Sequence, residues 1–425
     1  MIGSQQPNKY GHIFAKNLQA LTNFQETFTL IAKTSSGLEQ VLADELIGIG
    51  ATDVSLMTRA VSFTADKRMM YKANYCLRTA LRILKPLTSF KAREEDQLYD
   101  QVRKIDWSLL LSTEQTFAID AVVSGKYFTH SQYIALKTKD AIADQFRERF
   151  GKRPSVDTVA PHLRINLHIS NDQCNLLLDS SGDSLHKRGY RIVVDKAPIN
   201  EVLAAGLVLL TGWKGDSNFV DCMCGSGTIP IEAAMIAANI PAGYYREWFG
   251  FQHWVDFDEA LWKEVMTEAS DQIRDFDFEI IGSDRSAKAI DIARENVRKA
   301  HLHKDIQLFR KPMEQFVPPA GGGILVINPP YGERLEEENI NALYTLIGNT
   351  LKHKFKGYKA WVISSDFFAL KLIGLKPSKK IPVFNGPLDC RFVCFDIFDG
   401  SLKDKKTREA GSAGEMTDKD ANSNQ

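Results

Sequence analysis

A glycine turn stands between an apolar segment and a helix-like segment near the middle of the chain. The stretch VDCMCGSGTIPIEAAM (220–235) bends at residues 225–228 and then continues with helix formers. A phosphate-binding loop of the G-x4-G-K-[ST] type needs a lysine, and this turn has none. A dinucleotide fingerprint needs a third glycine, and Pro230 stands at that position. The turn therefore indicates either a plain structural bend or a site for a ligand without a polyphosphate.

S-adenosylmethionine is a ligand of this kind. Glycines let its amino-acid part lie against the backbone, and helix N-terminal amides can receive its carboxylate. Its ribose needs a carboxylate at the end of the next strand, and Asp284 ends the apolar segment IIGSD. We expect the cofactor to contact the turn and neighbouring positions, namely Pro198, Asp221, Cys222, Cys224, Gly225, Ser226, Gly227, Thr228, Asp284, Arg285 and Asn328.

A second chemical motif, Asn328-Pro329-Pro330-Tyr331, follows the apolar segment ILVI. Ligands of open α/β sheets bind at the carboxyl ends of strands, where this tetrapeptide must lie. Because prolines lack the N–H donor, the Asn328 side-chain oxygen and the Pro329 carbonyl can both accept from one amino group. That geometry turns the nitrogen lone pair toward a methyl sulfonium, while Tyr331 can stack on the base. Alone the motif fits a plain turn, but after the glycine turn and Asp284 it predicts amine methylation.

Longer segments are similar to those of one family. They read DSSGDSLHKRGYR (179–191), DCMCGSGT (221–228), NPPYGERL (328–335) and NGPLDCR (385–391). In these segments the chain resembles the THUMP-containing 23S rRNA guanine-N2 methyltransferases, a subgroup of the class I N-methylating enzymes. The resemblance spans about residues 28–398. It implies methyl transfer from S-adenosylmethionine to the exocyclic N2 amine of a guanine in 23S rRNA, during large-subunit assembly.

Two positions depart from the family pattern. Cys222 replaces the usual proline of the glycine turn, which a loop that works through its backbone should tolerate. Pro312 stands where relatives carry an acidic residue that is expected to hold the adenine amino group. Glu314 is the candidate substitute; otherwise stacking and backbone contacts must hold the adenine.

The elements around these motifs divide the chain into two halves. In the first half we expect a strand at 28–34, a helix at 37–50 capped by Ser36, a hairpin at 54–65 and a helix at 69–84 capped by Asp66. A strand, a long amphipathic helix and two further strands follow up to residue 182. From about residue 199 strands and helices alternate, which predicts an α/β, doubly wound, mostly parallel sheet that ends in an antiparallel hairpin.

Together with the resemblance, this pattern predicts a Rossmann-like methyltransferase domain preceded by α+β ferredoxin-like and THUMP modules. The expected divisions are a disordered tail (1–25), a ferredoxin-like module (26–68), a THUMP RNA-binding domain (69–181), the methyltransferase domain (182–400) and a second disordered tail (401–425). An insertion at 241–262 is rich in aromatic residues. These either stack on an extruded nucleotide or pack the insertion onto the domain.

Composition sets the cellular setting and the partner. The chain has no apolar run long enough for a membrane and no signal pattern, and its six cysteines do not form a metal-binding set, so we expect a cytoplasmic protein without metal. Net charge is zero, but residues 67–192 hold 21 Lys and Arg against 14 Asp and Glu, an excess of seven. We expect RNA phosphates to meet Lys126, Lys137, Lys139, Arg164, His186, Lys187, Arg188 and Arg191.

Three rival functions remain open from the sequence. The same chemistry can act on guanine N2 of tRNA, or on adenine N6 of DNA or RNA, because N-P-P-Y loops also occur in DNA-adenine and protein-glutamine methylases. The RNA-docking character of the first half disfavours DNA. A ribosome-assembly factor without catalysis is the remaining alternative, and the intact Asn328 and Asp284 argue against it.

Overall fold

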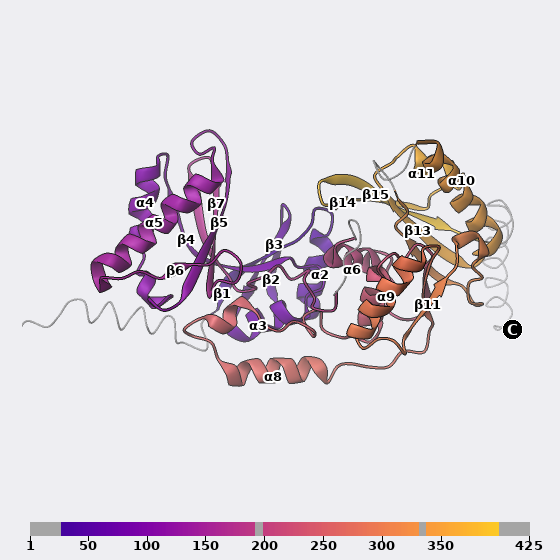
Figure 1. Ribbon diagram of the computed structural model, residues 1–425, viewed down its shortest axis with the longest axis horizontal. Coiled ribbons are helices and arrows are strands. Elements are labelled where there is room, and N and C mark those ends of the chain that lie inside the picture. Colours follow the sequence, from indigo (N-terminus) through magenta and orange to yellow (C-terminus); the bar gives the residue numbers. More distant parts are fainter. Residues whose placement is uncertain (1–26, 192–198, 331–336, 399–425) are drawn as a thin grey trace, which may run out of the picture. The chain divides into compact units, whose positions relative to one another are not determined.

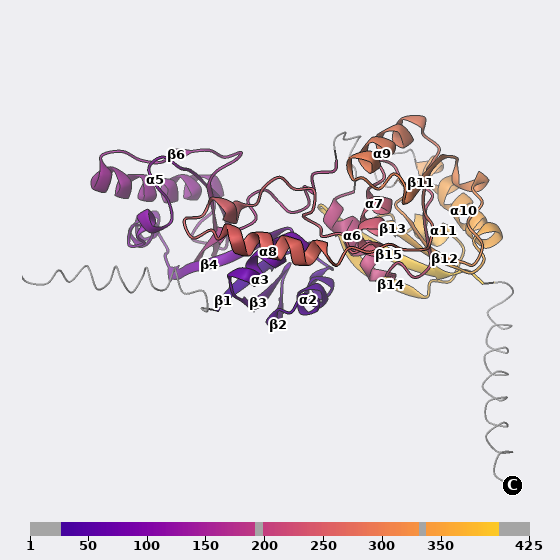
Figure 2. The ribbon, with the colours of Figure 1, turned by 90° about the horizontal axis from the view of Figure 1, so that it is seen from below.

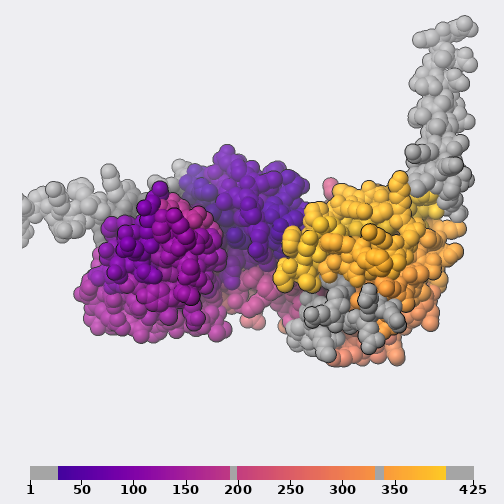
Figure 3. Space-filling model, turned by 90° about the horizontal axis from the view of Figure 1, so that it is seen from above, coloured from indigo at the N-terminus to yellow at the C-terminus, as the bar shows by residue number. Residues whose placement is uncertain are grey.

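The computed structural model describes residues 27–191, 199–330 and 337–398. These residues form two compact units, shown as ribbons in Figure 1 and as space-filling atoms in Figure 3. The first unit contains residues 27–191, 199–210 and 235–275. The second contains residues 211–234, 276–330 and 337–398. The insertion that interrupts the second half of the sequence thus belongs to the first unit.

The first unit contains one eight-stranded sheet in the order β2-β3-β1-β4-β8-β7-β5-β6. Its strands are β1 (Phe28–Lys33), β2 (Thr52–Met57), β3 (Ala60–Ala65), β4 (Arg82–Lys91), β5 (Thr116–Ser124), β6 (Ser155–Val156), β7 (Leu163–Ser170) and β8 (Gln173–Asp179). Strand β4 pairs with β1 through residues 82–84 and with β8 through residues 84–91. The two expected modules therefore share a continuous sheet.

The helices of this unit are α2 (Glu39–Gly48), α3 (Lys67–Cys76), α4 (Glu95–Arg103), α5 (Ser131–Phe150), α6 (Glu201–Leu210) and α8 (Glu259–Ser270). The Asp66 carboxylate accepts the Met69 amide at 2.7 Å, which confirms the expected cap of α3. The cap expected at Ser36 is wrong, because α2 starts after Leu38 and the Glu39 carboxylate accepts the Gly37 amide instead. The helix expected at 69–84 is also too long, since α3 ends at Cys76.

The aromatic residues of the insertion pack onto α3. Phe251 stacks on Tyr71 with ring centroids 4.4 Å apart, and Trp262 meets Tyr75 edge-on at 5.4 Å. Helix α8 lies beside α3, as Figure 2 shows, and Glu264 accepts a 3.0 Å ion pair from Arg68. The packing alternative for the insertion therefore holds for its buried rings. Tyr244 is the exception, with 45% of its surface exposed.

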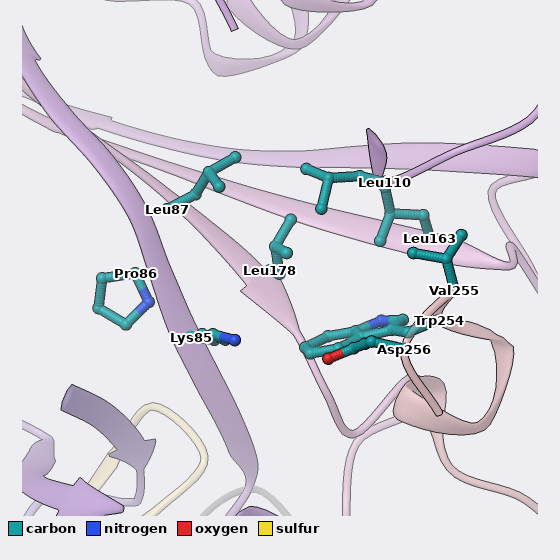
Figure 4. A pocket seen from close by; sticks show the side chains of 9 residues that line it. All are labelled: Lys85, Pro86, Leu87, Leu110, Leu163, Leu178, Trp254, Val255 and Asp256. Atoms are coloured by element: carbon teal, nitrogen blue, oxygen red, sulfur yellow. The ribbon is translucent and has the colours of Figure 1, made fainter. Parts of the chain in front are cut away.

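A small cavity lies where the insertion meets the sheet. Its volume is about 60 Å³, enough for a few water molecules. Figure 4 shows four leucines on the sheet side and the Trp254 indole opposite them. The lining residues are Lys85, Pro86, Leu87, Leu110, Leu163, Leu178, Trp254, Val255 and Asp256. We interpret this space as a packing gap, because it is too small for a nucleobase.

The second unit contains a seven-stranded sheet in the order β11-β10-β9-β12-β13-β15-β14. Its strands are β9 (Asn218–Asp221), β10 (Ile280–Asp284), β11 (Ile306–Arg310), β12 (Gly323–Ile327), β13 (Tyr358–Ser364), β14 (Lys379–Asn385) and β15 (Leu388–Asp396). The four pairings from β11 to β13 are parallel, and β15 runs antiparallel to both β13 and β14. The expected doubly wound sheet with an antiparallel end hairpin is confirmed.

Helices α7 (Thr228–Ala237), α9 (Ala287–Lys299), α10 (Glu337–Lys354) and α11 (Ala369–Leu372) connect these strands. One apolar core of this unit lies between α10 and the sheet, where Tyr344, Ile347, Leu351 and Phe355 are fully buried. Such burial fixes the strand ends that carry the polar motifs. Within the described ranges no helix is long and apolar enough to span a bilayer.

Candidate active site

The three sequence motifs follow three neighbouring strands. The sheet order places β9 between β10 and β12, all parallel. Asp284 ends β10, the glycine turn follows β9, and Asn328 follows β12. Because parallel strands end at the same edge, the sheet brings the predicted cofactor and amine groups together at the point where strand order reverses.

The glycine turn is held by its surroundings and is open on its ligand side. The Cys224 amide donates to the Ser283 carbonyl at 3.0 Å, and the Asn296 side chain donates to the Ser226 carbonyl at 3.0 Å. Gly225 has a φ of 53°, and a Cβ built there would meet no atom within 4 Å. The backbone at Gly225 can thus lie directly against a ligand, as the cofactor requires.

The proline at the third fingerprint position fits because a glycine stands opposite. A Cβ built on Gly282 of β10 would lie 3.3 Å from Pro230 Cγ and 3.2 Å from Cys224 Sγ. The space that a dinucleotide fingerprint obtains from a helix glycine is provided here by the strand. Pro230 therefore allows close packing of helix and strand.

Asp284 is tied to the glycine turn. Its Oδ2 accepts the Gly225 amide at 3.0 Å, and its Oδ1 accepts the Ser286 amide at 2.8 Å. The residue is only partly buried, so lone pairs of both oxygens remain available to hydroxyl donors. Arg285, the next residue, is exposed.

Asp221 is a buried carboxyl beside this site. It is 1% exposed and its Oδ1 accepts the Met223 amide at 3.0 Å. Burial, together with the negative charge of Asp284, raises the pKa of Asp221 to about 8. Burial also raises the pKa of the Cys222 and Cys224 thiols well above their usual range, so neither is a thiolate nucleophile.

The amine-binding motif contains an unsatisfied acceptor. Asn328 Oδ1 is buried and has no hydrogen-bond partner among the described residues. Leaving such a group unpaired costs about 1–3 kcal/mol, so this oxygen is poised to accept from a ligand. Pro329 is buried and Pro330 partly so. Tyr331, the predicted stacking residue, and Pro198 lie outside the described residues.

The glycine turn, Asp284 and Asn328 fit S-adenosylmethionine. An open backbone at Gly225, a strand-end carboxylate at Asp284 and an unpaired oxygen at Asn328 meet one sheet edge. When bound, the cofactor supplies an electrophilic methyl group. On the adenine side, Pro312 precedes a short 3-10 turn (Met313–Gln315) in which Glu314 is exposed. Whether Glu314 contacts adenine stays a prediction.

Four of the residues predicted to contact RNA are buried or bonded to other residues of the first unit. Arg188 is 1% exposed and donates to the Leu185 and Arg78 carbonyls. Arg164 is 8% exposed and pairs with Asp120 at 3.1 Å. Neither guanidinium is accessible to a phosphate in this structure, which corrects the expectation for both.

The other two internal contacts are His186 and Arg191. Burial, with the positive charge of Arg188 nearby, lowers the pKa of His186 to about 4, so its imidazole is neutral at pH 7. Arg191 pairs with Glu201 at 3.2 Å and is 14% exposed. Within the segment 179–191, His186, Arg188 and Arg191 therefore stabilise the fold, and Lys187 remains as an exposed cation.

The partner of this segment is Arg246, in a contact that the sequence did not predict. Arg246, from the insertion, donates to the carbonyls of Ser184 at 3.1 Å, Lys187 at 2.7 Å and Asp183 at 3.1 Å. Nothing in the local sequence marks Arg246, because its partners lie about 60 residues earlier.

The remaining predicted RNA contacts stay at the surface. Lys187 has a side chain 60% exposed, in an i,i+4 pair with Asp183. Lys126 is exposed beside the Tyr127 ring. Lys137 and Lys139 are paired with Asp96 and Asp140 and are 24% and 28% exposed. These lysines can still reach phosphate by exchanging a surface partner, which is weakly held.

The described part of the chain shows no metal-binding group. No cluster of three or more His, Cys, Asp or Glu in it could hold an ion, and the six cysteines are free thiols. The predicted site residues that the sheet order brings to one edge are those of the glycine turn, Asp221, Asp284 and Asn328.

Three family models match the chain in the expected order. The model described as "RlmL ferredoxin-like domain" matches residues 29–84, "THUMP domain" matches 92–179, and "RMKL-like, methyltransferase domain" matches 188–393. "Ribosomal RNA large subunit methyltransferase K/L" of Syntrophotalea carbinolica is 42% identical over 86% of this chain and 53% of its own length. The chain thus spans about half of that relative.

Other relatives are covered almost completely. "Putative RNA methyltransferase slr0064" of Synechocystis sp. is 37% identical over 86% of this chain and 96% of its own length. The crystal structure of SMU.472 complexed with SAH has a TM-score of 0.79 and 32% identity, covering 89% of this chain and 100% of that one. A Listeria monocytogenes structure, entitled "predicted N6-adenine-specific DNA methylase", has a TM-score of 0.78 and 29% identity, covering 92% and 99%.

The matches to the three domain models and to these relatives cover residues of both units. Because one relative is 37% identical over nearly its whole length, the chain belongs to the family of THUMP-containing, S-adenosylmethionine-dependent RNA methyltransferases with an RMKL-like catalytic domain.

Proposed function

We propose that this protein transfers a methyl group from S-adenosylmethionine to the exocyclic N2 amine of a guanine in 23S rRNA, in the cytoplasm during large-subunit assembly. The observation that carries the proposal is the buried Asn328 Oδ1 at the carboxyl end of β12, which has no hydrogen-bond partner among the residues that the structure describes. This strand lies next to β9, which leads into the glycine turn.

The acceptor pair of Asn328 and Pro329 selects an amine. An exocyclic –NH2 group offers two N–H donors, which the Asn328 oxygen and the Pro329 carbonyl can receive together. These two hydrogen bonds orient the amino group so that its lone pair is no longer conjugated with the ring and points toward the methyl donor. No strong base is required, since catalysis rests on positioning an in-line displacement.

The choice of RNA rests on the first unit, and the choice of guanine rests on the resemblance of residues 179–191, 221–228, 328–335 and 385–391 to the THUMP-containing 23S rRNA guanine-N2 methyltransferases. THUMP and RlmL ferredoxin-like models match this unit. The K/L relative is named for large-subunit ribosomal RNA, and it is 42% identical to this chain over 380 residues. The surface lysines Lys126 and Lys187 supply cations for phosphate.

A second candidate is methylation of adenine N6, because the same acceptor pair can hold that amine. The Listeria monocytogenes neighbour carries such a title. The THUMP match argues for RNA over DNA. Within RNA, the acceptor pair alone does not separate the two bases.

Nucleoside analysis separates the candidates. Large-subunit rRNA and, in a separate reaction, tRNA from a strain that lacks the protein are incubated with the purified full chain and S-adenosylmethionine, digested and examined by mass spectrometry. We expect N2-methylguanosine in the 23S rRNA. N6-methyladenosine would support the second candidate, methylation confined to tRNA would change the substrate, and 5-methylcytidine would contradict the amine-binding role of Asn328.

A further inference from the structure

Two phenylalanines follow the strand next to the amine-binding motif. Strand β13 pairs with β12 in parallel, with Ile327 opposite Val362. Phe367 and Phe368 come just after the end of β13, in the loop that leads into α11 (Figure 1). They therefore stand one strand away from Asn328, at the same edge of the sheet.

These side chains face solvent. Phe367 is 42% exposed and Phe368 is 61% exposed. Leu388, the first residue of β15, is 44% exposed and lies at this same edge, because β15 runs antiparallel to β13 with Arg391 opposite Ser364. Exposed apolar groups that cluster in this way mark a binding surface, because solvating them is unfavourable.

The loop that carries the two rings is held in a defined shape. The Asp366 carboxylate accepts the amides of Phe368 at 3.0 Å and Ala369 at 2.8 Å. The Ser364 hydroxyl accepts the Asp366 amide at 3.0 Å and is itself bonded to the buried Tyr344 hydroxyl at 2.7 Å. Preorganised rings lose little conformational freedom when a ligand stacks on them.

A positive charge backs one of the rings. The Arg391 guanidinium carbon lies 4.7 Å from the centre of the Phe367 ring, and the same guanidinium pairs with Asp389. Aromatic rings and arginine planes are the groups on which unpaired bases of RNA stack. The guanidinium beside the ring can also meet a phosphate of the stacked nucleotide, which favours RNA as the occupant of this surface.

We propose that Phe367, Phe368 and Arg391 form a stacking platform for an unpaired base that neighbours the methylated nucleotide in the RNA substrate. This deepens the proposed function and rests on it. A flipped-out guanine leaves its neighbours unstacked, and the platform recovers part of the lost stacking energy next to Asn328. Leu388 extends the apolar surface on the β15 side.

The chain offers a matched control. Phe278 is 43% exposed, almost the same as Phe367, and lies in the second unit just before β10. It stands at the amino end of a parallel strand, at the opposite edge of the sheet from Asn328. Phe278→Ala removes the same side chain without touching the platform.

The test measures where RNA binds, independently of methyl transfer. The full chain and its variants are titrated with an unstructured RNA dodecamer that carries a central 2-aminopurine, whose fluorescence falls on stacking. Ultraviolet crosslinking of a 4-thiouridine version is mapped onto tryptic peptide 360–371, which contains both rings. Binding of SAH by calorimetry verifies that each variant remains folded.

We expect the double variant Phe367→Ala/Phe368→Ala to lose affinity about tenfold or more, since stacking of one base is worth about 1–3 kcal/mol. It should also lose the fluorescence change and the crosslink, while Phe278→Ala keeps all three. Phe367→Trp in place of alanine should restore binding. SAH binding should be unchanged throughout.

Unchanged RNA affinity in the double variant, or a crosslink that maps elsewhere, would overturn the platform. Binding of single-stranded DNA but not RNA would overturn it too. So would a sedimentation result in which the wild-type chain is a dimer and the double variant a monomer, because the patch would then be a contact between two copies of the chain. If the platform binds RNA but nucleoside analysis finds no methylguanosine, the proposed function fails while this site stands.

Discussion

The Gly225 amide donates to Asp284 Oδ2 at 3.0 Å across 59 residues of sequence. This bond joins the glycine turn after β9 to the carboxylate at the end of β10, so the two motifs predicted to bind the cofactor are directly connected. Oδ1 of the same carboxylate accepts the Ser286 amide, which begins α9. The carboxylate is thus oriented by the fold, in place before any ligand arrives.

Replacing Asp284 should weaken binding of the cofactor. Asp284→Asn keeps an oxygen for one backbone amide but loses the charge that accepts from both ribose hydroxyls. We expect a drop of about tenfold in S-adenosylmethionine affinity, equal to about 1.4 kcal/mol, by calorimetry. Asp291→Asn is the control, since Asp291 on α9 is 71% exposed and pairs only with Arg294 in the described structure. Equal affinities for the two variants would contradict the ribose assignment.

Replacing Asn328 should separate cofactor binding from turnover. Asn328→Ala removes the unpaired oxygen but no contact that holds the glycine turn. We expect near-normal binding of the cofactor and a fall in kcat of about 100-fold or more, because only an aligned amine attacks productively. Single-turnover kinetics on rRNA measures this. A change confined to the KM for RNA would assign Asn328 to binding instead of alignment.

The buried Asp221 carboxyl predicts a pH dependence of stability. Its folded pKa of about 8 lies above the value of an unfolded aspartate, about 4, so the folded state binds the proton more tightly. The stability it contributes is complete below about pH 4 and is lost as pH rises through about 8.

Asp221→Asn is isosteric and keeps an acceptor for the Met223 amide. We therefore expect its melting temperature, without cofactor, to fall less between pH 6 and pH 9 than that of the wild-type chain. Thermal melts across this range provide the measurement. Parallel curves for both proteins would show that Asp221 ionises freely.

Alanine substitutions of the adjacent residues Lys187 and Arg188 should affect different properties, RNA binding for Lys187 and folding stability for Arg188. Arg188→Ala removes a buried guanidinium that donates to the Leu185 and Arg78 carbonyls, so we expect a loss of about 1–3 kcal/mol in the free energy of unfolding. Lys187→Ala should leave stability nearly unchanged and weaken RNA binding, more so at low salt. Denaturant unfolding and RNA titration at two salt concentrations measure both. A stable Arg188→Ala that binds RNA poorly would restore its role as a phosphate contact.

The insertion changes how domain deletions should be designed. Residues 235–275 pack with the first unit, where Phe251 stacks on Tyr71 and Arg246 binds carbonyls of residues 183–187. A fragment that starts at residue 199 would expose these aromatic rings. Point variants of the full chain therefore test RNA binding more cleanly than truncation.

Local chemistry in the sequence was enough to predict the second sheet and most of its site. Apolar strands followed by the glycine turn, Asp284 and Asn328 predict the same edge, because parallel strands of one sheet must end together. The Asp66 cap follows the same logic, since its bond to Met69 spans only three residues. The missing lysine of the turn likewise required no tertiary information.

Long-range contacts decided the rest. Residues 82–84 fit a continued helix in sequence, but pairing with β1 and β8 makes them part of β4, because strand pairing depends on distant partners. Arg188 and His186 look like surface cations until the Leu185 and Arg78 carbonyls and the buried setting are known. Burial of a charged group is a property of the folded chain, so the sequence alone determined which residues carry a positive charge, and the tertiary structure decided which of these side chains are exposed.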